Sequence, residues 1–491
     1  MASKELYGRK VIYADAIEVD SSNIGAIVKE AYDTHEGNSS DIDYLYGYYL
    51  GKQEILNRVK TYNTEINNKV VENRAYEIVS FKTGYLLSAP IQYIDNAAND
   101  DTEEVENSDL AQLTKWCSME NKDTEDMSLA KWQSIAGTAY RMALPYKEIL
   151  FENGSPFEII GLDPRNTFVV YSSRLGHKPL VGVTYITLSD DKKIFYCYTD
   201  KEFFVLNNDF EISTDEEEKS GSHSLGMIPI IEYPANNSRV GDIEIVLTLL
   251  DAGNTIQSNR IDGVEQFVQS ILCLEGMEIM PGPDQTQTQA ESAFMDELRE
   301  IGGLLLPPGA KAYYLSQELN QDQTQTLKDD NYEAILTISG MPNRNGGSST
   351  SDTGSAVILR DGWNAAESRA KSTENFFKRS ERRFLNLITM IANENGLQLD
   401  PQEIGIRFPR RNYTNDSSNV SNLTTMLSSD WIRPEFAYEH CNMTPDPHRE
   451  YLLAKKWHEA QEEETVNDLA QVNAEMSEEE HEADHITEDA V

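Results

Sequence analysis

The chain has 491 residues, 39% of them hydrophobic, with a mean hydropathy of −0.53 and a formal net charge of −41. This length exceeds what one hydrophobic core usually serves, and the polar composition favours long exposed helices, channel walls or disordered ends over a compact single-domain enzyme. The charge argues against broad binding of DNA phosphates, which needs many Lys and Arg contacts. An acidic wall past which DNA slides is compatible with this charge, and so is plain solubility.

Targeting signals and cysteine pairs are absent from the sequence. No stretch has the pattern of a signal peptide, and no run reaches the roughly 18 apolar residues that a membrane span needs, so a soluble cytosolic chain is expected. The cysteines are scattered and form no CxxC pair, which favours buried free thiols over disulfides or a zinc site. They are Cys117, Cys197, Cys273 and Cys441.

The first part of the chain is predicted to be an arm followed by helices. Residues 1–38 are weakly patterned, and a tyrosine-rich helix is expected to begin at Ser39. A second helix is predicted from the spacing of Val70, Tyr76, Val79 and Leu86, and it ends before Pro90. After an acidic loop, the stretches LAQLTKWCSMEN and MSLAKWQSIAGTAYRMAL predict two more helices.

Residues 147–233 are predicted to be an antiparallel β region. Short β-branched and aromatic runs such as FEIIGL, TFVVYSS, LVGVTYITL, KIFYCYT and EFFVLN are separated there by Gly, Asn and Asp.

Two helices are then expected on either side of a small α/β knob at residues 272–319. Apolar and polar seam positions alternate by three and four along 243–271, and a shorter helix covers about 322–339, ended by Gly340 and Pro342. Asn254 and Gln257 on the first seam are poor choices for an isolated coiled coil.

A flexible Gly/Ser loop precedes a very long helix. The loop contains NRNGGSSTSDTGS, and the three-four alternation then continues from Ala356 to Ile391, with Gly362 as an expected bend. A last helical pair is predicted around 420–460. Residues 459–491 hold thirteen of the acidic residues and no Lys or Arg, so their far end is expected to be disordered.

No motif of a common enzyme is present. The sequence lacks GxxxxGK[ST], GxSxG, HExxH, an EF-hand loop and GxGxxG, so neither an NTP-driven motor nor the usual nucleophile, zinc, calcium or dinucleotide sites are predicted, and no cofactor is expected. His481 and His485 lie four residues apart in the acidic tail, where a solvated surface is favoured over metal binding.

Several stretches, in this order along the chain, resemble the portal proteins of long-tailed phages of Gram-positive hosts. They include YYLGKQEILNR, NNKVVENRAYEIVSFKTGYLLSAPI, GMIPIIEYPANNSRVGDIEIVLTLLDAGNTIQSNRIDGVEQF, GSAVILRDGWNAAESRAKSTENFF and WIRPEFAYEHCNMTPDPHREYLLAKK. Together they cover roughly residues 40–456. Each stretch is weak alone, and their shared order makes the resemblance specific.

The resemblance implies a mainly helical α+β portal fold. An N-terminal arm (1–38) would precede a wing with a β-rich insertion (39–241). A first stem helix (242–271), an α/β clip (272–319) and a second stem helix (320–339) would follow. The rest would be a tunnel loop (340–355), a long kinked helix (356–395), a helical crown (396–458) and an acidic tail (459–491).

The resemblance also implies function and partners. The chain would form a ring of about twelve copies at the unique capsid vertex, a closed heterologous assembly. It would pass double-stranded DNA during packaging and ejection, dock terminase and a head-to-tail connector or adaptor, and meet scaffold and major capsid proteins. Its location would be the virion, and the host cytoplasm during assembly. It would not be an enzyme.

Two groups of residues are candidates for these roles. In the tunnel loop, Arg344 is the only basic residue, and a ring of such residues would face the passing phosphates together with Asn343, Asn345, Ser348 and Ser349. An exposed hinge is the alternative. In the clip, the stretch LLLPPGAKAYYL offers contacts suited to partner docking, namely Leu305, Tyr313 and Tyr314, although a buried core strand also fits its leucines.

A ring is also predicted from the helices themselves. The seams on 243–271 and 356–391 are expected to be too long for burial inside one protomer of this composition. Two other classes of protein remain open: another virion structural protein, such as a minor head or adaptor protein, and a hydrolase with unrecognised carboxylates.

Overall fold

The computed structural model describes residues 4–61, 64–95, 108–146, 154–215, 219–268, 271–276, 279–283, 285–301, 308–315, 321–343, 362–409, 416–441, 443, 447 and 450–461. The chain divides into two compact units. The first comprises Met1–Glu5, Leu50–Arg74 and Val246–Leu336, and the second comprises Leu6–Tyr49, Ala75–Ile245 and Thr337–Val491. Helices and sheets both occur, as expected for an α+β fold. Among the described helices, none has the length and apolar character needed to cross a bilayer.

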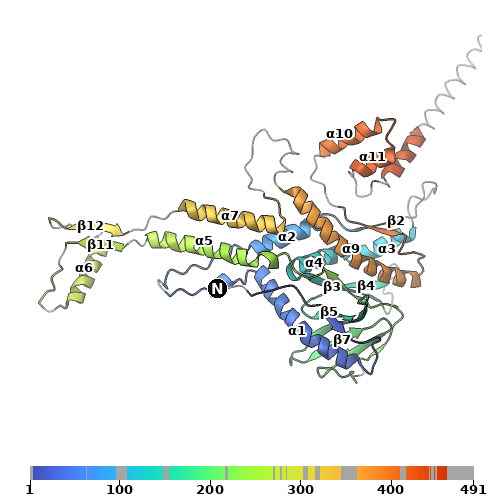
Figure 1. The fold of residues 1–491 in the computed structure, drawn as a ribbon, viewed down its shortest axis with the longest axis horizontal. Helices are drawn as coiled ribbons and strands as arrows, with labels where there is room; N and C mark the ends of the chain where they lie inside the picture. Colours follow the sequence, from blue (N-terminus) through green and yellow to red (C-terminus); the bar gives the residue numbers. More distant parts are fainter. Residues whose placement is uncertain are drawn as a thin grey trace, which may run out of the picture. The chain divides into compact units, whose positions relative to one another are not determined.

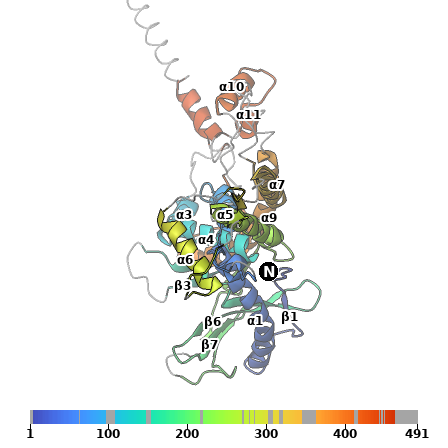
Figure 2. The same cartoon turned by 90° about the vertical axis from the view of Figure 1, so that its left-hand side faces the viewer.

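One sheet of the second unit is covered by a long helix. Among the described residues its strand order is β1-β5-β6-β7-β8-β9, with β1 parallel to β5 and the other neighbours antiparallel. Phe168 and Val170 of β5 join the core under α1, whereas Val169 between them joins a different cluster on the opposite face, as strand periodicity requires. Figures 1 and 2 show α1 beside these strands. The bounds are α1 Ile24–Tyr49, β1 Ile12–Ala14, β5 Thr167–Ser172, β6 Pro179–Thr187, β7 Lys193–Tyr198, β8 Glu202–Leu206 and β9 Gly221–Ser222.

The predicted start of the first helix at Ser39 is wrong, because α1 begins at Ile24. Its buried stripe alternates by four and three from Ile24 to Leu45, but two of its members are polar, His35 and Asn38. The His35 ring lies 2.9 Å from the backbone oxygen of Arg165, and the Asn38 amide exchanges two hydrogen bonds with the backbone of Lys10. These polar members interrupted the apolar pattern and concealed the first half of the helix.

A second sheet has the order β10-β3-β4 and is bordered by α4 and α9. The stretch MSLAKWQSIAGTAYRMAL is therefore not one helix, as predicted. Helix α4 ends at Ala136, Gly137 caps it in the left-handed region at φ 77°, and the residues after it form β3. A Cβ on Gly137 would lie 2.0 Å from the Arg239 oxygen. The bounds are β3 Thr138–Pro145, β4 Phe157–Leu162, β10 Ile230–Pro234, α4 Lys122–Ala136 and α9 Trp363–Glu394.

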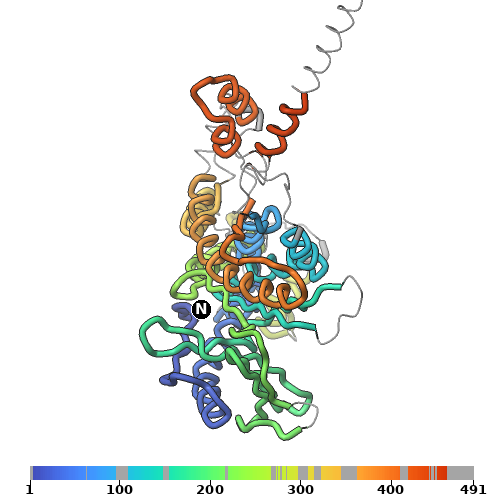
Figure 3. The backbone as a smooth tube through the Cα atoms, turned by 90° about the vertical axis from the view of Figure 1, so that its right-hand side faces the viewer, coloured from blue at the N-terminus to red at the C-terminus, as the bar shows by residue number. Residues whose placement is uncertain are grey.

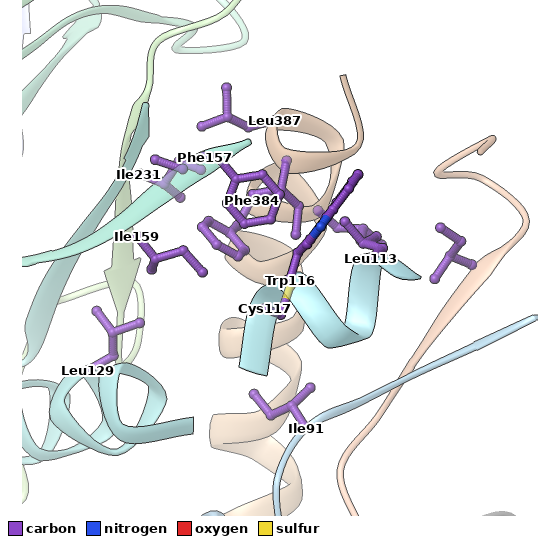
Figure 4. Packing of buried hydrophobic residues seen from close by; sticks show 14 of the residues in the cluster. Ile91, Leu113, Trp116, Cys117, Leu129, Phe157, Ile159, Ile231, Phe384 and Leu387 are labelled. Atoms are coloured by element: carbon purple, nitrogen blue, oxygen red, sulfur yellow. The ribbon is translucent and has the colours of Figure 1, made fainter. Parts of the chain in front are cut away.

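The largest cluster of buried apolar side chains packs α9 against this sheet, α3 (Ser108–Met119) and the end of α2 (Arg74–Leu86). Figure 4 shows Phe384 and Leu387 of α9 facing Phe157 and Trp116, and Figure 3 follows α9 in orange beside α3 in cyan. From Phe377 to Ile391 the stripe of α9 is thus buried within its own chain. For Phe377–Ile391 the expectation that this seam needs a neighbouring subunit for burial was wrong, whereas Ala370 and Thr373 of the same seam are only partly buried.

The predicted bend at Gly362 is also corrected. Gly362 is the N-cap of α9, with φ 82°, so it precedes the described helix and does not kink it. Residues 356–361 of the predicted long helix lie outside the described residues.

After α9 the chain continues within the second unit as a strand that the sequence did not predict. Strand β13 (Ile404–Arg407) pairs antiparallel with β2 (Gln92–Asp95). Two short helices follow, α10 (Asp416–Leu427) and α11 (Pro434–Cys441), and residues 450–461 are helical. Residues 462–491, most of the tail for which disorder was expected, lie outside the described residues.

Besides Met1–Glu5 and Leu50–Arg74, the first unit contains two helices and an α/β insertion. Helix α5 (Leu247–Val268), strand β11 (Ile271–Glu275), helix α6 (Gln287–Ile301), strand β12 (Lys311–Leu315) and helix α7 (Gln321–Ser339) follow one another along the chain. β11 and β12 form an antiparallel pair. The predicted helix at 322–339 and the predicted α/β content of 272–319 are confirmed.

Candidate channel and docking sites

One side of α5 binds the backbone of residues 68–72 through three polar side chains. Asn254 accepts the N–H of Glu72 at 2.9 Å, Ser258 accepts that of Val70 at 3.0 Å, and Asp262 accepts that of Asn68 at 2.8 Å. Four residues of a helix rise about 6 Å, which is close to the length of two residues of an extended segment. The helix and the segment 68–72 therefore stay in register. We call these three hydrogen bonds the polar ladder.

The polar ladder ends in a charged group at Asp262. Its carboxylate lies 2.5 Å from the Lys60 ammonium and 3.0 Å from the Arg58 guanidinium. Burial on its own raises the pKa of Asp262, but the hydrogen bonds from Lys60 and Asn68 outweigh it and lower the pKa below its usual value. Asn254, which is unfavourable in a coiled-coil seam, thus serves to hold a segment of the same chain.

Polar side chains also join α5 to α7, the two helices that lie side by side in Figure 1. Lys328 donates to Gln257 at 2.7 Å and Arg260 donates to Gln325 at 2.6 Å. Asn331 donates to the backbone oxygen of Leu249 at 3.1 Å.

The predicted apolar stripe of α7 is only partly buried. Ile335 is 2% exposed, whereas Leu327 is 56% exposed, and Val264 of α5 is about half exposed. The helix pair is therefore fixed internally by polar contacts and retains apolar side chains on its surface.

The β11–β12 pair carries two of the predicted docking residues. Tyr313 lies opposite Cys273, and Tyr314 lies opposite Leu272. The Tyr313 side chain is 47% exposed, so it is accessible in the described chain. Leu305 lies outside the described residues.

The structure describes only the beginning of the predicted tunnel loop, residues 340–343. Arg344, Asn345, Ser348 and Ser349 lie outside the described residues, whereas Asn343 lies in the short stretch after α7 and is partly buried.

Where the predicted loop begins, α7 and α9 are linked by Arg369. Its guanidinium donates to the backbone oxygen of Ile338 at 2.6 Å. This hydrogen bond satisfies a carbonyl in the last turn of α7. Gly340, with φ 70°, makes room for this side chain, since a Cβ there would lie 2.2 Å from the Arg369 Cδ.

Helix α9 is anchored by a buried cluster of four charges, Lys122, Asp126, Arg141 and Glu381, which we call the charge cluster. Lys122 lies 2.6 Å from Asp126 and 2.8 Å from Glu381, and Arg141 binds both carboxylates. Tyr233 donates to Glu381 at 2.8 Å. Burial on its own raises the pKa of Glu381, but the charges of Arg141 and Lys122 outweigh it and lower the pKa to about 2.

Sequence reasoning missed the charge cluster. Glu381 lies within the apolar stripe of α9, and Arg141 lies within the apolar stretch that forms β3. A charged residue within an otherwise apolar stripe is the sequence signal that could have indicated the charge cluster, because a buried charge needs a buried partner of opposite charge.

Comparison with known proteins identifies the family. Residues 29–467 match the model of the family described as "Phage portal protein, SPP1 Gp6-like". The portal protein of Bacillus phage SPP1 is 19% identical over 484 residues, covering 90% of this chain and 87% of that protein.

Solved structures of gene transfer agent particles are also similar to this chain. One is the neck of an empty particle computed with C6 symmetry, with a TM-score of 0.43, 10% identity and coverage of 77% of this chain and 91% of that one. Another is the virion of a native particle, with a TM-score of 0.43, 10% identity and coverage of 83% and 94%.

The family match places the chain among phage portal proteins, the structural proteins of the genome conduit used in DNA packaging. Because the family model matches most of the length of this chain, the chain belongs to the SPP1 Gp6-like portal family.

Proposed function

We propose that the chain forms a closed ring of about twelve copies at one vertex of a phage capsid. The genome would enter and leave through the ring, which would have no enzymatic activity and would dock terminase during packaging and a head-to-tail connector afterwards. The match to the portal family over residues 29–467 carries this proposal. Assembly would take place in the host cytoplasm, with scaffold and major capsid proteins as further contacts.

The regional roles follow the order of elements. We assign 242–271 and 320–339 to the stem, 272–319 to the clip, 340–355 to the tunnel loop and 356–395 to the long helix behind it. Residues 39–241 would be the wing, 396–458 the crown and 459–491 an acidic tail. The predicted arm, residues 1–38, would be packed onto the wing sheet through β1 and the first half of α1. The polar contacts that hold α5 beside α7 support a stiff stem, and the exposed Tyr313 supports a clip that meets partners.

The channel role rests on Arg344. Its guanidinium, repeated around the ring, would make weak and repeated contacts with DNA phosphates in an otherwise acidic passage, assisted by Asn343, Asn345, Ser348 and Ser349. Arg344→Glu should therefore reduce DNA packaging or retention in particles that assemble normally. The matched control is Arg174→Glu, which makes the same charge change at an exposed position in the second unit. Equal packaging by both variants would rule out the channel role.

The docking role rests on Tyr313, Tyr314 and Leu305. Glutamate at both tyrosines would place charge within an apolar contact, and we expect intact rings with weakened terminase binding, measured by pull-down. Tyr7→Glu is the control, since Tyr7 is 83% exposed and belongs to a different segment. Unchanged terminase binding by the double variant would remove this assignment.

A further inference from the structure

A cavity of about 80 Å³ lies in the second unit between α2, α4, α9 and the segment after β10. Its apolar wall includes Phe81 and Ala370, and its charged wall is formed by Lys82, Asp242 and Arg369. One water needs about 10 to 15 Å³ measured in this way, so the cavity can hold a group of several heavy atoms.

The hydrogen-bonding capacity of the two cations is largely unused in the described structure. Lys82 has one partner among the described residues, an oxygen of Asp242 at 3.9 Å, which is beyond hydrogen-bond distance. The other oxygen of Asp242 accepts the Ser134 hydroxyl at 2.8 Å. Arg369 uses one nitrogen for the Ile338 oxygen, and the described residues show no further hydrogen bond from its guanidinium.

Placing two cations beside one cavity has an electrostatic cost. Burial lowers the pKa of Lys82, and the charge of Arg369 lowers it further, while Asp242 acts in the opposite direction. Asp242 offsets one of the two positive charges, which leaves a net charge of about +1 beside the cavity, where Lys82 is mostly buried and Arg369 is exposed. A bound anion would offset that charge and accept the remaining N–H groups of both cations.

We propose that this cavity binds a small oxyanion, a phosphate or a carboxylate group, between the Lys82 ammonium and the Arg369 guanidinium. The proposal uses none of the predicted channel and docking residues and does not depend on the portal role. Because Arg369 also binds the end of α7, an anion here would contact the residue that links α7 to α9.

Calorimetric titration of the full chain with inorganic phosphate tests the site. Lys82→Gln should weaken phosphate binding about tenfold, since a hydrogen bond to a charged group is worth about 1.5 to 3 kcal/mol. Lys131→Gln is the matched control, because Lys131 is a partly buried lysine of the same unit that lies over the Tyr49 ring. Equal phosphate affinity in wild type and Lys82→Gln, or no phosphate binding by wild type, overturns the proposal.

A second variant excludes a simple loss of folding. Asp242→Asn removes the negative charge that competes with the anion and can keep the hydrogen bond from Ser134, so phosphate binding should tighten several-fold. Misfolding cannot produce such a gain, and an unchanged or weakened affinity counts against the site.

The oxyanion could be a carboxylate of a second copy of the chain or a free phosphate. Titration with phosphate or acetate, with the assembly state followed by light scattering, distinguishes the two sources. If the natural occupant is a carboxylate side chain of a second copy, millimolar phosphate or acetate should shift the protein toward smaller assemblies in light scattering, and Lys82→Gln should do the same. If the occupant is free phosphate, phosphate should bind without changing the assembly state.

Discussion

At the scale of single residues, the charge cluster fixes the position of α9. Its two cations and two carboxylates come from α4, β3 and α9, so sliding α9 by one turn would separate Glu381 from both Arg141 and Lys122. Burying four charges is expensive, and only mutual pairing offsets the cost. The cluster therefore favours one register over others that the apolar stripe alone would tolerate.

Replacing Glu381 by Gln should destabilise the protein by about 3 to 5 kcal/mol, because two buried cations would then share a single carboxylate. Denaturant unfolding followed by circular dichroism measures this loss. Glu394→Gln, an exposed change on the same helix, is the control. Equal stability of the two variants would show that the cluster does not hold α9.

His35 predicts a pH dependence. Burial lowers its pKa to about 4, below the value of about 6.5 in an unfolded chain, so the unfolded state binds more protons between these values. Its contribution to stability is complete above pH 6.5 and declines as the pH falls toward 4. Between pH 7 and 5 we expect a loss of about 2 kcal/mol from this residue.

The measurement is the free energy of unfolding at pH 7 and pH 5. His35→Gln retains a donor for the Arg165 oxygen but cannot titrate, so its stability should fall less over this range than that of wild type. His458→Gln, at an exposed position in the helix of residues 450–461, should behave as wild type. If His35→Gln and wild type lose the same free energy, His35 is not the cause.

At the scale of elements, the polar ladder predicts a local effect in α5. Asn254→Ala removes the acceptor for the Glu72 N–H, which should cost about 1 to 3 kcal/mol. Hydrogen exchange should show faster exchange of the Glu72 amide, with less change at amides of the second unit. Thr255→Ala, at the next position and exposed, is the control. An unchanged Glu72 exchange rate in Asn254→Ala would contradict the ladder.

The same elements show what the sequence can predict. Strands β4 to β8 and helix α7 were found because their apolar spacing is regular and Gly, Asn, Asp or Pro marks their ends. The first half of α1 was missed because His35 and Asn38 occupy buried positions, and β3 was read as helix because the left-handed geometry of Gly137 is not visible in the spacing.

The same limit applies to the candidate docking site and to the charge cluster. The exposure of Tyr313 is compatible with the predicted docking contact, whereas the charge cluster depends on contacts between residues 240 positions apart, Arg141 and Glu381. Such pairings arise from tertiary packing, and local periodicity carries no information about them.

At the scale of the whole molecule, the central claim is that this acidic chain assembles as a portal. Burial of Phe377–Ile391 within the protomer weakens the argument for a ring from the α9 seam, so the claim rests on the family match over residues 29–467. With a net charge of −41, copies of the chain repel one another, and screening at moderate salt should favour assembly.

Electron microscopy of the purified full chain, with end-on views at several salt concentrations, tests the claim most directly. We predict closed rings of about twelve subunits with a central hole, and light scattering of the same samples should give the corresponding mass. A uniform monomer at micromolar concentration under all of these conditions would contradict the account.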